Sequence, residues 1–150
     1  MDSSRAILLV EDNPDDEALT LRALKKNNII NEVFVASSGE EAIEYLFGQG
    51  PQLGEQRAAI TPQIILLDLN LPKMSGLDVL RQIRASAGTR LLPVVVLTSS
   101  KEDEDIINSY ALGANAYVRK PVDFAQFTEA VRALGLFWLL LNEVAARPHA

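Results

Sequence analysis

A short run of aliphatic residues that ends in a carboxylate is the feature that most constrains this chain. Residues 64–67 are Ile-Ile-Leu-Leu, Asp68 follows them directly, and Pro72 closes the segment. A continuous apolar run bounded by a turn signal indicates a strand buried on both faces, as in the middle of a parallel sheet. Asp68 would then lie at the carboxyl end of that strand, where open α/β sheets bind ligands. A buried carboxylate is costly without a positive partner, so the sequence predicts that another segment supplies one.

Four further strand-like segments alternate with helical segments along the chain. They are residues 6–10, 32–36, 94–97 and 115–119. Such alternation predicts a parallel sheet with helices on both faces, because right-handed crossovers place them there. We predict a flavodoxin-like, doubly wound α/β fold with strand order 2-1-3-4-5, five helices and an extended last helix.

Local signals indicate where three of the helices begin. The first should start at Pro14, and the second should open with a capping box formed by Ser38 and Glu41. Ser75 and Gly76 should lead into the third. The residues expected on the apolar side of the first helix are Ala18, Leu21 and Leu24.

The bulk properties are those of a soluble, acidic protein. A length of 150 residues fits one domain, with a core of about 5–134, a helical extension of about 135–145 and no output domain. The formal charge of −6 argues against binding to a nucleic-acid backbone. The absence of cysteine fits a reducing cytoplasm, and the longest apolar stretch, residues 136–141, is too short to span a membrane.

The long segment of residues 48–62 contains three glycines, Gly48, Gly50 and Gly54. Their spacing differs by one residue from a dinucleotide-binding fingerprint, and the segment follows a helix where that fingerprint follows a strand. We therefore interpret it as a surface loop.

Polar residues follow four of the five predicted strands. They are Glu11 and Asp12, Asp68, Thr98, and Lys120. The carboxyl ends of parallel strands are neighbours, so these side chains should meet, and three carboxylates in one crevice repel one another unless they share a cation. Oxygen ligands of this kind suit Mg²⁺. A hydroxyl and an ammonium group beside them suit a phosphoryl group, and an aspartate can act as its nucleophilic acceptor.

The order of these residues resembles the receiver domain of two-component response regulators. The resemblance covers about residues 5–134 and includes the Leu-Asp-Leu-Asn-Leu-Pro-x-Met-x-Gly motif around Asp68, the pair at residues 98–99, and Tyr117-x-x-Lys120-Pro121. It implies that Asp68 accepts a phosphoryl group from a phosphohistidine on a partner kinase. It also implies that the chain is a signalling protein and not a metabolic enzyme.

The resemblance further implies a role for each residue of the site. Mg²⁺ would be held by Asp12, Asp68 and the backbone carbonyl of Asn70, with Glu11 acting through water. Thr98 and Lys120 would contact the phosphoryl oxygens. Thr98 and Tyr117 would form the switch that couples phosphorylation to a change of conformation or of dimerisation.

Three other features resemble stand-alone receivers that serve phytochrome-type kinases. They are the tail at residues 136–143, the long loop after the second helix, and residues 13–16. The last helix also carries two apolar stripes, which is more than one sheet-facing side requires. We therefore expect a homodimer with Phe137, Trp138 and Leu140 near the contact.

Three alternative functions remain open from the sequence. A phosphatase of the haloacid type would need a second acid two residues after the nucleophile, where this chain has Asn70. A flavodoxin-like binding module would need a phosphate loop after the first strand, where acidic residues stand instead. A receiver that only drains phosphate from its kinase would have the same sequence features.

Overall fold

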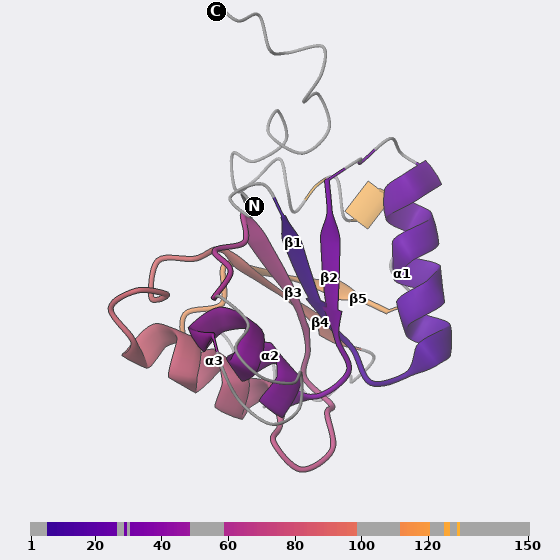
Figure 1. Cartoon of the computed structure of the whole chain (residues 1–150). Coiled ribbons are helices and arrows are strands. Elements are labelled where there is room, and N and C mark those ends of the chain that lie inside the picture. Colours follow the sequence, from indigo (N-terminus) through magenta and orange to yellow (C-terminus); the bar gives the residue numbers. More distant parts are fainter. Residues whose placement is uncertain are drawn as a thin grey trace, which may run out of the picture.

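The computed structural model of the chain describes residues 6–26, 29, 31–48, 59–98, 112–120, 125–126 and 129. Its strands are β1 (Ile7–Val10), β2 (Val33–Ala36), β3 (Ile64–Asp68), β4 (Val94–Thr98) and β5 (Ala116–Arg119). Its helices are α1 (Pro14–Lys26), α2 (Gly39–Phe47) and α3 (Gly76–Ala85) (Figure 1). None of the helices in these ranges is long and apolar enough to cross a membrane.

The strands form one parallel sheet in the order β2-β1-β3-β4-β5. This confirms the predicted doubly wound α/β fold and its strand order. The predicted fourth helix and almost all of the predicted last helix lie outside the described residues.

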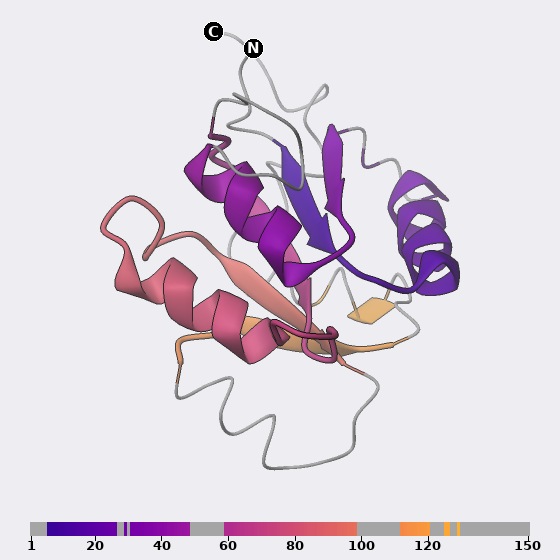
Figure 2. The ribbon, with the colours of Figure 1, turned by 60° about the horizontal axis from the view of Figure 1, so that its bottom comes forward.

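Helices cover both faces of the sheet, with α1 on one side and α2 and α3 on the other (Figure 2). Side chains alternate between the faces along each central strand. The sheet separates two hydrophobic cores. In β3, Ile65 and Leu67 belong to the core shared with α2 and α3, whereas Ile64 and Leu66 belong to the core that contains Leu24 of α1. All five residues of β3 are buried, including Asp68. The strand that ends at Asp68 is therefore a central strand covered on both sides.

The first turn of α1 is defined by Asn13, whose Oδ1 accepts hydrogen bonds from the backbone N–H groups of Asp15 (2.8 Å) and Asp16 (3.1 Å). Pro14 follows as the first helical residue, as predicted. The prediction that Ala18 lies on the apolar side of the helix is wrong: Ala18 is exposed, and Thr20 is buried. The buried side of α1 is therefore rotated relative to the apolar pattern and includes Thr20 and Leu24.

The capping signals of α2 and α3 are largely confirmed. Ser38 accepts a hydrogen bond from the Glu41 N–H at 3.1 Å, but the Glu41 carboxylate returns to the N–H and hydroxyl of Ser37. In α3 the capping box is complete, between Ser75 and Asp78. Both helices therefore begin at positions that the sequence signals.

Arg84, near the end of α3, ties this helix to the segment that enters β5. Its guanidinium group donates hydrogen bonds of 2.6–3.0 Å to four acceptors, the carbonyl oxygens of Arg90, Leu92 and Gly113 and the Oδ1 of Asn115. Asn115 Oδ1 also accepts from the N–H of Val94 at the start of β4. One side chain thus connects α3, β4 and β5. The contacts lie at the amino ends of the two strands, on the opposite side of the sheet from the carboxyl end that carries Asp68.

We expect Arg84→Lys to lower the free energy of unfolding by about 2 kcal/mol, because a lysine cannot reproduce the planar set of donors. Arg81→Lys is the matched control, since Arg81 is exposed and its ion pair with Asp78 at 3.1 Å is on the surface. The control should change stability by less than about 0.5 kcal/mol. Equal losses in urea denaturation of the two variants would contradict this account.

Candidate functional site

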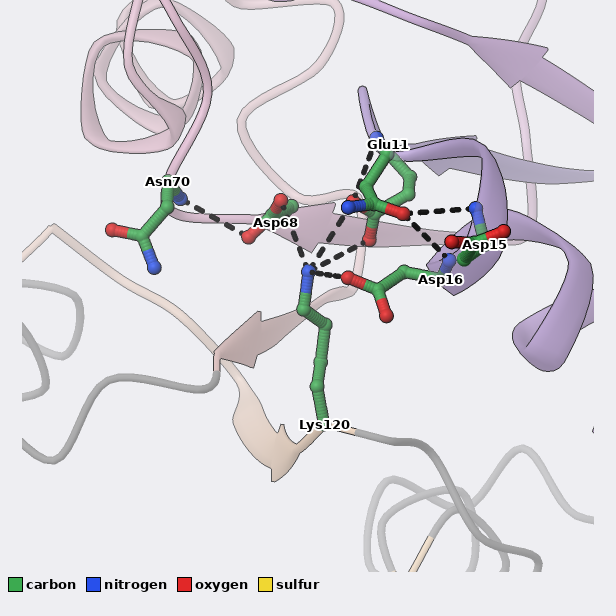
Figure 3. A network of polar contacts seen from close by, with 7 residues as sticks. Glu11, Asp15, Asp16, Asp68, Asn70 and Lys120 are labelled. Carbon is green, nitrogen blue, oxygen red and sulfur yellow. Dashed lines mark hydrogen bonds and ion pairs between the residues drawn. The ribbon is translucent and has the colours of Figure 1, made fainter.

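The polar residues that follow the strands meet at one edge of the sheet. Asp68 ends β3 and pairs in register with Leu97 of β4, while Glu11 follows β1 directly. Lys120 follows β5 and reaches across the edge toward both (Figure 3). Glu11 and Lys120 are 109 positions apart in the sequence. The predicted meeting of these strand ends is therefore observed in the structure.

Asp68 is almost completely buried, at 1% exposure. Its Oδ1 accepts a hydrogen bond from the backbone N–H of Asn70 at 3.0 Å, and its Oδ2 lies 3.2 Å from Lys120 Nζ. The Asn70 side chain points away from Asp68 (Figure 3), and an amide in any case supplies neither an acid nor a base. The two contacts fix both carboxylate oxygens at the end of a rigid strand.

Lys120 is the cation that this edge of the sheet requires. Its Nζ lies 3.0 Å from Glu11 Oε1, 3.0 Å from Asp16 Oδ2 and 3.2 Å from Asp68 Oδ2. Burial alone lowers the pKa of Lys120, but the hydrogen bonds to Asp16 and Glu11 and the charges of Asp68 and Glu11 together raise it above its ordinary value. Lys120 therefore stays charged and neutralises part of the acidic edge.

Glu11 is fully buried and is held by two donors, Lys120 and the backbone N–H of Asn13 at 3.2 Å. Burial and the neighbouring charge of Asp68 raise the pKa of Glu11 to about 7, against the lowering effect of Lys120 and Asn13. In the metal-free protein this carboxyl group therefore titrates near neutral pH.

The carboxylates of Glu11, Asp12 and Asp68 form a cluster that could hold a metal ion. One oxygen from each lies within 4.8 Å of the others, and Asp12 is exposed whereas the other two are buried. A set of oxygen ligands with one side open to solvent fits Mg²⁺, which binds few carboxylates and keeps several waters. The donor set present therefore fits the predicted cofactor.

The remaining predicted site residues are only partly described. Thr98 ends β4 and Tyr117 lies within β5, in register with Val96, but the side chains of Thr98 and Tyr117 are outside the described part of the structure. The Asn70 main chain lies beside Asp68 through its N–H. Phe137, Trp138 and Leu140 are also outside the described residues. The roles assigned to these residues stay predictions.

Sequence reasoning missed one residue of the site, Asp16. Neither Asp15 nor Asp16 is among the predicted site residues, yet Asp16 contacts Lys120 and Asp15 is not among the three carboxylates that do. The signal that could have identified Asp16 is Asn13, whose cap sets the rotation of the first turn of α1. The sequence shows two adjacent acids, and only the cap geometry distinguishes them.

Comparison with known proteins supports this reading of the site. The family described as "Response regulator receiver domain" matches residues 7–132. Among curated proteins, the chain is 38% identical over 135 residues to the response regulator Rcp1 of Synechocystis. The aligned residues make up 90% of this chain and 89% of Rcp1. The Mn²⁺-bound structure of Rcp1 is similar with a TM-score of 0.70 and 38% identity, covering 90% of this chain and 94% of that one.

Two further solved structures are similar over most of the chain. The bacteriophytochrome response regulator AtBRR is 51% identical with a TM-score of 0.77, covering 93% of this chain and 98% of AtBRR. The phosphorylated cyanobacterial phytochrome response regulator RcpA is 38% identical with a TM-score of 0.71, covering 91% and 94%. These relatives are signalling regulators and not metabolic enzymes.

Receiver domains bind Mg²⁺ in an acidic pocket and pair with sensor histidine kinases. The acidic cluster at the carboxyl edge, the match across residues 7–132 and the similarity to Rcp1 and AtBRR agree with one another. The chain belongs to the response regulator receiver domain family.

Proposed function

We propose that this receiver accepts a phosphoryl group on Asp68 from the phosphohistidine of a sensor histidine kinase. The observation that carries the proposal is the position of the Asp68 carboxylate, which is buried between the Asn70 N–H and the Lys120 ammonium and belongs to the acidic cluster. A buried carboxylate with fixed oxygens and a cation beside it suits nucleophilic attack on phosphorus.

In the transfer, an Asp68 oxygen forms a bond to phosphorus while the phosphorus–nitrogen bond to the donor imidazole breaks. The electron pair of that bond stays with the imidazole nitrogen. Negative charge remains on the phosphoryl oxygens, and Lys120, already 3.2 Å from Asp68, is placed to donate hydrogen bonds to one of them. We assign Thr98 to the same role, and Thr98 with Tyr117 to the switch, on their positions in β4 and β5.

The residues that would hold Mg²⁺ are Asp12, Asp68 and Glu11, together with the Asn70 carbonyl. When bound, the ion supplies positive charge that offsets the repulsion between the carboxylates and the incoming phosphoryl group. Glu11 was expected to act through water, and its contact with Lys120 fits an outer position.

We further propose that the donor is a phytochrome-type kinase and that the exchange takes place in the cytoplasm, where such kinases take phosphate from ATP. The support is the similarity to AtBRR and RcpA, whose names state a phytochrome partner. A binding assay against the kinase domains of phytochrome-type histidine kinases, with an unrelated histidine kinase as control, tests this choice of partner.

The direct test of the phosphoacceptor is intact mass after incubation with acetyl phosphate. The wild type should gain one phosphoryl group in Mg²⁺ and none in chelator, and Asp68→Asn should gain none in either condition. Asp78→Asn, which changes an exposed capping acid of α3, is a control that should be labelled like the wild type. An adduct on Asp68→Asn, or none on wild type even with a competent kinase, would refute the proposal.

Affinity for Mg²⁺ should depend on pH because of Glu11. Below about pH 7 the Glu11 carboxyl is protonated in the metal-free protein, and a metal ion must displace that proton. The dissociation constant should therefore rise by about tenfold per pH unit below pH 7 and level off above it. Calorimetric titrations from pH 5.5 to 8.5 measure this, and Glu11→Gln should be flat over the same range.

The same raised pKa affects the stability of the metal-free protein. Folding favours the protonated form of Glu11. The stabilisation of the folded state by this group is therefore complete below about pH 4.5 and is lost as the pH rises through about 7. The test is the difference in unfolding free energy between the wild type and Glu11→Gln, measured in chelator at pH 6 and pH 8. An equal difference at the two pH values would contradict the raised pKa of Glu11.

We also retain the homodimer as a proposal, with Phe137, Trp138 and Leu140 near the contact. Its support is the pair of apolar stripes in the sequence of residues 124–144. Sedimentation at tens of micromolar, with and without a phosphoryl analogue, should show a dimer. A monomer under both conditions would remove this proposal and leave the receiver chemistry untouched.

A further inference from the structure

Asp16 contacts the cation of the site but does not belong to the acidic cluster. Among the described residues, the cluster that could hold a metal ion consists of Glu11, Asp12 and Asp68. Lys120 Nζ contacts two members of that cluster and, in addition, Asp16 Oδ2 at 3.0 Å. Of the three acids that contact Lys120 (Figure 3), Asp16 is therefore the one that lies outside the cluster.

The direction of the Asp16 side chain is fixed by the start of α1. Asn13 Oδ1 accepts the backbone N–H of Asp16 at 3.1 Å, and Asn13 itself is anchored through its N–H to Glu11 Oε2 at 3.2 Å. The turn that carries Asp16 is thus bonded to a buried acid of the site. Asp16 is 30% exposed, whereas the Lys120 side chain is 8% exposed.

An ammonium group has three N–H donors, and three acids now accept from Lys120. A divalent cation held in the acidic cluster would offset the charge of Glu11 and Asp68 that Lys120 now offsets, and the attraction between Lys120 and these two acids would weaken. The metal ion would not weaken the contact between Lys120 and Asp16, because Asp16 lies outside the cluster. Two N–H donors would become available while the third stayed bonded.

We propose that Asp16 is a positioning residue that holds the Lys120 ammonium beside Asp68 when the acidic cluster is loaded with metal. This inference rests on the proposed phosphoacceptor role of Asp68. The tether keeps one N–H donor on α1 and directs the other two toward the oxygens of the phosphoryl group. Removing it leaves Lys120 charged but free to move toward solvent.

The competing account is that Asp16 only stabilises the positive end of the α1 dipole. Asp15 provides the matched control, because it is in the same first turn, carries the same charge and has its N–H on the same cap. Both Asp15→Asn and Asp16→Asn remove one charge at this helix terminus. Only Asp16→Asn removes the charge from a contact with Lys120 and leaves at most a neutral acceptor there.

The first experiment measures the rate of phosphorylation by acetyl phosphate at saturating Mg²⁺. Asp16→Asn should be slower than wild type by roughly tenfold, the effect of losing one charge-assisted hydrogen bond, and Asp15→Asn should match the wild type. In a Lys120→Met background, Asp16→Asn should have no further effect, because it acts through Lys120. Equal rates for the two Asn variants, or a faster Asp16→Asn, would overturn the proposal.

The second experiment does not depend on phosphorylation. An amine-reactive reagent modifies Lys120, and peptide mass spectrometry measures the extent relative to the exposed Lys25, Lys26 and Lys73. In Mg²⁺, Lys120 of Asp16→Asn should react roughly tenfold faster than Lys120 of wild type or Asp15→Asn. Unchanged protection would overturn the tether even if phosphorylation failed. Conversely, the wild type could fail to be phosphorylated while Lys120 still reacts faster in Asp16→Asn. That result would refute the phosphoacceptor role of Asp68 but would establish the contact between Asp16 and Lys120.

Discussion

Lys120→Met should lower the free energy of unfolding of the metal-free protein by about 3 kcal/mol, because it leaves buried acids without a cation. Glu11 and Asp68, at 0% and 1% exposure, would then face each other without the one cation that contacts them among the residues the structure describes. Methionine fills a similar volume, so the loss reports the charge and not the packing. Urea denaturation in chelator measures it.

Magnesium should restore much of this loss, because the ion offsets the same repulsion between the acids. Lys26→Met is the control, since it removes one positive charge from an exposed position in the last turn of α1. It should cost less than about 0.5 kcal/mol and should respond to Mg²⁺ as the wild type does. A Lys120→Met protein as stable as the control in chelator would show that the acids are satisfied by other means.

Gly76→Ala should cost roughly 3 kcal/mol, although alanine is the better helix former. An added Cβ at Gly76 would collide with the carbonyl oxygen of Asp68 and would lie 2.6 Å from the Cα of Leu69. Both atoms are main chain and cannot move aside as a flexible side chain would. Relief therefore requires a shift of the strand end that carries Asp68, and the rate of phosphorylation should fall together with stability.

Gly88→Ala is the matched control for this prediction. Apart from its two chain neighbours, no atom of the described residues lies within 4 Å of a Cβ built on Gly88, which is in the exposed segment after α3. Its unfolding free energy should be within about 1 kcal/mol of wild type, with a small gain expected from a less flexible unfolded chain. If the two alanine variants were equally stable, close approach of α3 to the Asp68 main chain would not be the constraint that the geometry indicates.

The fold and the centre of the site could be predicted because they depend on signals that are local in the sequence. The apolar run before Asp68 is recognisable as a buried strand, and five alternating segments leave few arrangements of a parallel sheet. Once the sheet is parallel, the ends of its strands must be neighbours. The meeting of Glu11, Asp68 and Lys120 follows from topology alone and needs no side-chain detail.

What could not be predicted depends on the rotation of elements by a fraction of a turn. Ala18 fits the apolar spacing of α1, but the cap at Asn13 and the packing of the helix bury Thr20 instead. The same rotation decides that Asp16 and not Asp15 contacts Lys120. Arg84 was missed because three of its four acceptors are backbone carbonyls, which any sequence provides. Residue types carry no information about such contacts.

The separation of 109 positions between Glu11 and Lys120 has a consequence for the order in which the molecule is completed. A ribosome releases β1 and β3 with their acids well before β5, so the acids of the nascent sheet are exposed before Lys120, which contacts them in the folded chain, is available. Of the five strands, β5 is the last to emerge, and it brings Lys120 to acids more than a hundred positions away. Acquisition of a competent acidic edge and completion of the sheet are therefore the same event, and truncated products lack both.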